Sequence, residues 1–120
     1  MPFKSKYLFI ASMDVEPEKE ALFNEVYDGE HVPYLGSVSG VGRIVRGEKQ
    51  DLLAVPGVES MFKSAPDEPK YSAYYELDNP EILGSPAWLQ AVNEGRWVDQ
   101  VRPYTRNRRH LLMKIIYPSE

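Results

Sequence analysis

The sequence predicts an α+β fold in which a four-stranded antiparallel sheet carries its helices on one face. Two observations predict it. Four short segments, at 7–13, 40–47, 71–77 and 108–117, are rich in β-branched and aromatic residues, and helical patterns follow the first and the third. Two strand–helix–strand halves of this kind give the ferredoxin-like order βαββαβ. With 120 residues, of which 42% are apolar, the chain is expected to form one domain, 1–120.

The first half begins with a strand over 7–13 whose side chains are apolar in both directions, as in a strand covered on both sides. Glu16-Pro17 then opens a helix, because proline suits the first turn and acidic side chains there interact well with the helix dipole. Gly29 is expected to end this helix. Pro33 is expected to start a second, short helix before the next strand.

The second half has a clearly alternating strand at 71–77. Two helix starts follow it, in each of which a capping residue precedes proline: Asn79-Pro80 and Ser85-Pro86. Gly95 is expected to stop or kink the second of these helices, and the last strand is expected over 108–117.

An irregular insertion is expected at about 48–70, because Pro56-Gly57, Pro66 and Pro69 interrupt any regular pattern there. It is longer than the usual connection of ~4–6 residues. Such a loop is often a lid or an interface arm, and a plain surface insertion is the alternative.

The sheet face without helices is expected to be apolar, because the first and last strands carry hydrophobic side chains in both directions. A face of this kind is kept from water when two sheets pack together. The sequence therefore predicts a sheet-to-sheet homodimer of identical chains.

Charge and composition exclude several classes of protein. The net charge of −4 argues against a nucleic-acid partner, although arginines crowd the C-terminal part of the chain and acidic residues the first helical region. The absence of cysteine and of a signal-like or ~20-residue apolar segment favours a cytoplasmic protein without a membrane partner. Two widely spaced histidines give no metal signature, so no metal and no cofactor are expected.

The chain resembles the dimeric α/β barrel superfamily, specifically its EthD-like branch. The resemblance covers nearly the whole chain and is weakest over 49–69. It rests on an acidic helix after Asp14-Val15 and on these further segments: Phe23-Asn24-Glu25-Val26-Tyr27, Glu30-His31-Val32-Pro33, Gly40-Val41, Tyr74-Tyr75-Glu76-Leu77 and Ser85-Pro86-Ala87-Trp88. Relatives in this superfamily include cofactor-free monooxygenases, dehydratases, lactone isomerases and members without an assigned activity. The resemblance implies the fold and a cavity between helices and sheet, not one reaction.

His31 is the leading catalytic candidate, because a pKa of ~6.5 allows an imidazole to exchange a proton near neutral pH. The resemblance implies that it lies near the mouth of the cavity, where Glu30 or Asp28 could orient the ring. The alternative is a histidine that closes the helix end by binding a carbonyl group and supports Pro33.

A set of polar and aromatic residues is predicted to bind the substrate: Asn24, Tyr27, Tyr34, Arg43 and Trp88. The tyrosines and Trp88 are equally compatible with an ordinary core, in which a buried tyrosine satisfies one hydrogen bond. Arg43 could bind a carboxylate or pair with a glutamate of the partner chain.

Two functions follow. The first is a cofactor-free enzyme that acts on a small apolar cyclic or phenolic compound by proton transfer at His31, which gives dehydration, isomerisation or oxygenation. The second is a non-catalytic binder of small ligands, or an accessory protein, with the same pocket. A purely structural dimer without a pocket is a third possibility.

Overall fold

The computed structural model describes residues 6–58 and 62–118. Its sheet has the strand order β2-β3-β1-β4, and each pair of neighbours is antiparallel. The strands are β1 (Tyr7–Val15), β2 (Val41–Glu48), β3 (Tyr71–Leu77) and β4 (Thr105–Lys114). This order confirms the predicted ferredoxin-like fold.

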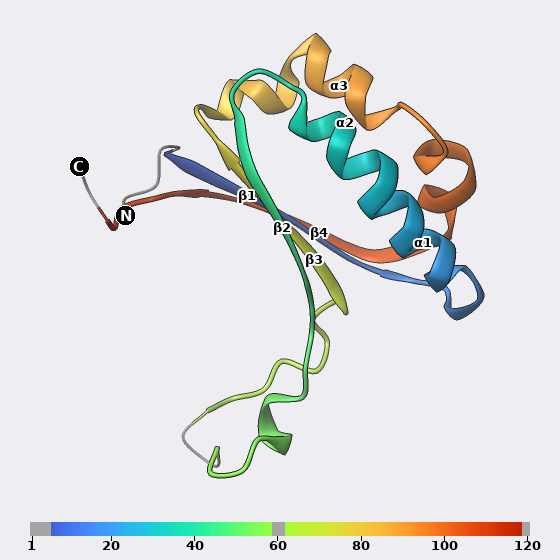
Figure 1. Ribbon diagram of the computed structural model, residues 1–120. Helices are drawn as coiled ribbons and strands as arrows, with labels where there is room; N and C mark the ends of the chain where they lie inside the picture. The colour runs from blue at the N-terminus through green and yellow to red at the C-terminus, as the bar shows by residue number, and fades with distance from the viewer. Residues whose placement is uncertain (1–5, 59–61, 119–120) are drawn as a thin grey trace.

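The helices lie together on one face of the sheet, as Figure 1 shows. They are α1 (Glu20–Val26), α2 (Val32–Gly36) and α3 (Pro86–Val92). Shorter helical turns extend or connect them: Pro17–Lys19, Tyr27–His31, Leu52–Ala54, Pro80–Gly84, Trp97–Val101 and Arg102–Tyr104. Among the described residues, no helix has the length and hydropathy that crossing a bilayer requires.

The first helical run does not end at Gly29, and this prediction was wrong. A π-helical turn over Tyr27–His31 joins α1 to α2, and the Val32 N–H donates to the Tyr27 carbonyl five residues back. Helix α2 begins at Val32, next to the predicted start at Pro33, but without a break. A π-turn is the usual way for a helix to absorb one extra residue, and it often marks a functional site.

The strand β4 lies earlier in the chain than predicted, at Thr105–Lys114 rather than 108–117. Its N-terminal extension pairs with the end of β1 beyond a register shift between Ser12 and Asp14. Beyond this shift β4 stays paired with β1 although its residues there are polar, so the apolar pattern alone could not locate the start of the strand.

The core lies between the helices and the sheet. Alternate residues of β1 and β3 face it, among them Ala73, Tyr75 and Leu77, each about 1% exposed or less. Phe23 and Val26 of α1 are fully buried against this layer.

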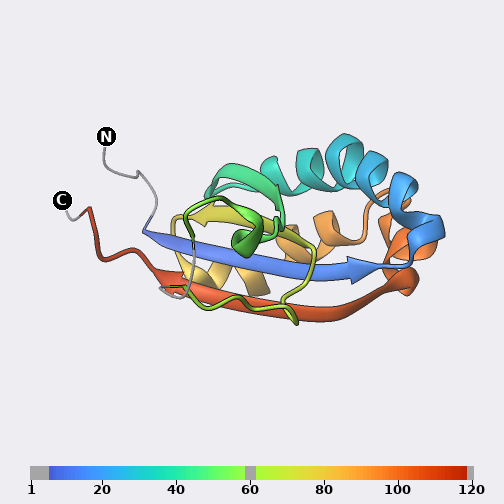
Figure 2. The same cartoon turned by 90° about the horizontal axis from the view of Figure 1, so that it is seen from below.

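None of the helices α1, α2 and α3 lies over the opposite face of the sheet, as Figure 2 shows from below. We call this surface the open face. Strand alternation and register place these apolar residues on it: Leu8, Ile10, Val45, Tyr74, Leu111 and Met113. The last four are exposed in the single chain.

Candidate functional site

An aromatic layer fills the space between the helices and the sheet. Phe9 of β1 packs against Tyr75 of β3, with ring centroids 5.6 Å apart, and edge-on against Trp88 of α3, at 6.1 Å. Trp88 also lies edge-on to Tyr75, at 5.6 Å. The predicted binding residue Trp88 is therefore a buried wall of this layer.

His31 lies at one end of the same layer and is only 5% exposed. Its ring stacks on Trp97, with centroids 4.2 Å apart and planes at 20°, and meets Tyr27 edge-on at 5.0 Å. The π-turn explains this placement. Because it widens the helix, it keeps residues spaced by four, such as Tyr27, His31 and Leu35, on the buried side.

The Nδ1 atom of His31 is buried and has no hydrogen-bond partner among the described residues. Burial, as the largest cause, and the positive charges of Arg102, Arg108 and Arg46 together lower the pKa of His31 from 6.5 to about 4. The imidazole is therefore neutral at pH 7. Unlike the helix-closing histidine considered above, it does not hold a carbonyl group through this atom.

Two tyrosine hydroxyls meet in the core. The Tyr27 and Tyr75 oxygens are 3.1 Å apart and buried. Burial raises the pKa of both phenols, so both are protonated at neutral pH. Tyr27, which is predicted to bind the substrate, lies next to His31, whereas Tyr75 is not among the predicted binding residues.

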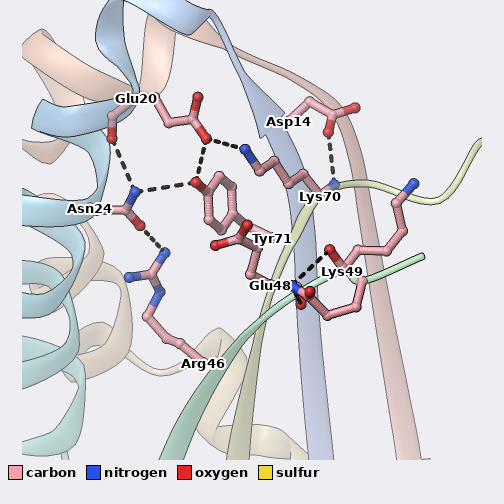
Figure 3. A network of polar contacts seen from close by, with 9 residues as sticks. Asp14, Glu20, Asn24, Arg46, Glu48, Lys49, Lys70 and Tyr71 are labelled. Carbon is pink, nitrogen blue, oxygen red and sulfur yellow. Dashed lines mark hydrogen bonds and ion pairs between the residues drawn. The ribbon is translucent and has the colours of Figure 1, made fainter. Parts of the chain in front are cut away.

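Arg46 of β2 closes the helix side of the layer. Its guanidinium lies 4.3 Å from the centre of the Tyr27 ring and donates to Asn24 Oδ1 at 2.9 Å and to Asp28 Oδ1 at 2.6 Å. Figure 3 shows Arg46 and Asn24 together with Tyr71, whose hydroxyl Asn24 also contacts at 3.3 Å. Nothing in the local sequence around Arg46 indicates this contact with Tyr27.

The carboxylates predicted to orient His31 have other partners. Glu30 accepts hydrogen bonds from the Arg96 backbone N–H at 2.8 Å and from its Nε at 2.6 Å, and these contacts lower the pKa of Glu30. Asp28 is bound by Arg46, and its side chain is 66% exposed. Both residues therefore position arginines of distant elements rather than the imidazole.

Two further predicted residues lie away from the ring. Arg43 lies on the open face, where it pairs with Glu76 of its own chain at 2.7 Å. Tyr34 is 36% exposed, and Gly95 lies against its ring. Trp97, by contrast, is not among the predicted binding residues, and the structure stacks it directly on His31.

The two hollows measured on the surface lie elsewhere, at the insertion. One, of about 580 Å³, is polar and includes Asp14 and Asn107. The other, of about 980 Å³, lies between the insertion and Tyr74. Neither of these two hollows includes His31.

No known family model and no curated protein matches this sequence. Solved structures do match it. An EthD family protein from Bacillus halodurans is 14% identical, with a TM-score of 0.57 over 92% of this chain and 99% of that one. The heme-degrader MhuD from Mycobacterium tuberculosis, with two hemes bound in its active site, is 11% identical, with a TM-score of 0.56 over 95% and 99%.

A dimeric protein of unknown function and ferredoxin-like fold from Bacteroides fragilis is 15% identical, with a TM-score of 0.55 over 95% of this chain and all of that one. At these identities the likeness establishes the fold. The chain has the ferredoxin-like fold on which dimeric α/β barrel proteins are built. An EthD family protein is among the structures that share it, in agreement with the resemblance found in the sequence.

Proposed function

We propose that the protein binds a small apolar cyclic or phenolic molecule in the aromatic layer between helices and sheet, with His31 as its polar contact. The observation that carries this proposal is the unpartnered Nδ1 of a histidine that is almost fully buried. A buried polar atom without a partner costs roughly 1–3 kcal/mol, which a ligand hydrogen bond would recover. The surrounding rings offer an apolar contact surface.

The proposed chemistry is proton transfer. A neutral imidazole can take a proton from a phenol or from carbon next to a carbonyl group, which leads to dehydration or isomerisation, or to oxygenation with dioxygen as co-substrate. The proposal assigns this step to His31 alone, since Glu30 and Asp28 hold Arg96 and Arg46. Tyr27 and Tyr75 are protonated and could donate to a developing oxyanion.

The lowered pKa of His31 favours the second function, a binder without turnover. A base with a pKa of about 4 is weak at neutral pH. Such a group still accepts or donates one hydrogen bond. Binding is therefore the part of the proposal that the geometry supports most strongly, and turnover is its finer part.

We further propose that two copies pack through their open faces. The exposed apolar residues on strands β2, β3 and β4 support this, because a monomer would leave them in water. The dimeric state of the Bacteroides fragilis protein of the same fold supports it as well.

Ligand binding can be measured by tryptophan fluorescence, because the chain has two tryptophans and both belong to the site region. We expect 4-nitrophenol to quench the emission saturably. His31→Phe keeps the stack on Trp97 but removes the nitrogen atoms, so the affinity should fall about tenfold, as for one lost buried hydrogen bond.

The matched control is His110→Phe. His110 stacks on Phe9 at 5.9 Å at the edge strand, and its substitution should leave the affinity unchanged. Absence of saturable quenching in the wild type, or equal affinities for wild type and His31→Phe, would overturn the binding proposal.

A further inference from the structure

The insertion between β2 and β3 projects from the sheet on the side away from the helices. We call its described residues, 49–58 and 62–70, the arm. Figure 1 shows the arm extending beyond the strand ends, and Figure 2, from below, shows it in front of β1 and β4. It therefore stands on the same side of the molecule as the open face.

The base of the arm is fixed to three strands. The Lys49 N–H donates to the Lys70 carbonyl at 2.7 Å, and the Lys70 N–H donates to Asp14 Oδ1 of β1 at 2.8 Å, as Figure 3 shows for the second of these contacts. Arg109 of β4 binds Glu68 at 2.8 Å. The chain connection to β2 and the side-chain contacts with β1 and β4 give the arm a defined direction.

The Asn107 side chain adds to this anchor. It donates to Asp14 Oδ2 at 3.0 Å and to the Asp67 carbonyl at 3.1 Å, so one amide joins β1, β4 and the arm. Its backbone has a φ of 54°, a left-handed conformation that asparagine tolerates better than most residues. The anchor is thus built from specific polar contacts rather than from apolar collapse.

Beyond this anchor the arm exposes apolar side chains. Four of them are between 41% and 50% exposed: Leu52, Leu53, Val55 and Phe62. The short helical turn Leu52–Ala54 holds the two leucines, and the Asp51 side chain caps it by accepting from the Leu53 N–H at 3.2 Å. Apolar side chains that are presented by an ordered turn are typical of an interaction surface.

The arm and the open face form one concave surface. The hollow of about 980 Å³ has Leu52 and Pro66 of the arm on one side and Ser72 and Tyr74 of the open face on the other. Tyr74 lies in register with Val45 on the same face. A protein that packs on the open face therefore contacts the arm as well.

We propose that the arm of each protomer clasps a second copy of this chain, with its apolar turn packed on the partner's sheet layer. This inference rests on the sheet-to-sheet dimer of the proposed function. A second copy is the occupant because the hollow is continuous with the open face. A two-fold axis also repeats the arm contact once from each protomer, so both sets of exposed leucines are covered at once.

The test compares two leucines of nearly equal exposure. Leu53 on the arm is 49% exposed and Leu89 on α3 of the helix layer is 53% exposed. Sedimentation over a dilution series of the full chain gives the dimer dissociation constant. We expect Leu53→Asp to weaken the dimer at least tenfold and Leu89→Asp to leave it unchanged.

A second measurement reports on the arm without weakening the dimer. Because the chain has no cysteine, Leu53→Cys and Leu89→Cys each carry one thiol for an environment-sensitive dye such as acrylodan. The dye at position 53 should shift to the blue over the concentrations at which the mass doubles, and the dye at position 89 should not.

The possible failures are distinct. A wild-type chain that is monomeric at all concentrations overturns both the dimer and the clasp. A stable dimer in which both aspartate variants behave alike, and in which neither dye shifts, overturns the clasp and leaves the sheet-to-sheet dimer in place.

Discussion

At the scale of single residues, His31 is unusual because stability alone does not explain it. A phenylalanine could stack on Trp97 in its place without leaving a buried nitrogen unpaired. Burial and the nearby arginines lower the pKa of the His31 ring to about 4. That shift makes a prediction that does not depend on any ligand.

Acidification should destabilise the fold through His31. In the unfolded chain His31 binds a proton near pH 6.5, and in the folded chain it does so only near pH 4. The contribution of the neutral His31 to the free energy of unfolding is therefore full above pH 6.5 and is lost as the pH falls towards 4. From pH 7.5 to pH 5 the loss should be about 2 kcal/mol. Urea unfolding at the two pH values measures it.

His31→Phe should remove most of this pH dependence. The pKa of His110 is also lowered, through burial and Arg108, so its effect has the same sign and His110→Phe serves as the control. Carboxylates such as Glu30 and Glu76 have lowered pKa values as well, but they start from 4.5 and act mainly below pH 5. An unchanged slope in His31→Phe would contradict the proposed burial of the ring.

The sequence was informative about which residues matter and less so about their partners. His31 and Tyr27 were identified from residue type and spacing, and the structure brings them together. The partner of Glu30 is Arg96, 66 residues away, and no local pattern reveals such a contact. The catalytic roles of Glu30 and Asp28 stay predictions.

At the scale of elements, the strand pattern was the most reliable signal. The β3 bounds were predicted correctly because alternating buried and polar residues define both faces of that strand. The π-turn was missed because Gly29 and Pro33 resemble a helix end and a new start. The helical run instead continues past Gly29 and Pro33, because one wider π-helical turn joins α1 to α2.

The two glycines near this turn should respond oppositely to alanine. Gly29 has no positive φ, and a Cβ there meets nothing within 4 Å, so Gly29→Ala should stabilise the protein by about 0.5–1 kcal/mol. Gly95 has a φ of 72°, and a Cβ there would collide with the Glu30 carboxylate and crowd the Tyr34 ring. Gly95→Ala should therefore destabilise it, by at least about 1 kcal/mol.

Thermal unfolding of the two variants beside the wild type checks this pair. The comparison is sharp because Gly95 lies beside the Glu30–Arg96 contact that joins the two helical regions. A stabilised Gly95→Ala would show that the contact is not tight. A destabilised Gly29→Ala would show that the π-turn needs glycine.

At the scale of the whole molecule, the unequal faces of the sheet determine what the fold can do. One face builds an aromatic interior with the helices, while the other leaves Val45, Leu111 and Met113 about half exposed or more. The sequence predicted this asymmetry from the apolar character of both sides of the first and last strands. It could not predict the direction of the arm, which depends on polar contacts between segments far apart in the chain.

Leu111 and Leu112 are neighbours in β4, and their side chains lie on opposite faces of the sheet. Leu111 pairs with Ile10 on the open face and is 58% exposed, whereas Leu112 pairs with Phe9 on the helix side and is 47% exposed. Leu111→Asp places a charge in the proposed interface and should weaken the dimer by roughly a hundredfold or more, because an unpaired buried charge adds to the lost apolar contact.

Leu112→Asp introduces the same charge one residue away and should leave the dimer mass at twice 13.8 kDa. Light scattering at micromolar concentration distinguishes the two, and circular dichroism confirms that both variants are folded. The substitutions share the strand and the charge, and both residues are about half exposed, so the main difference between them is the face of the sheet. Equal masses for the two variants would mean that the open face is not where the copies meet.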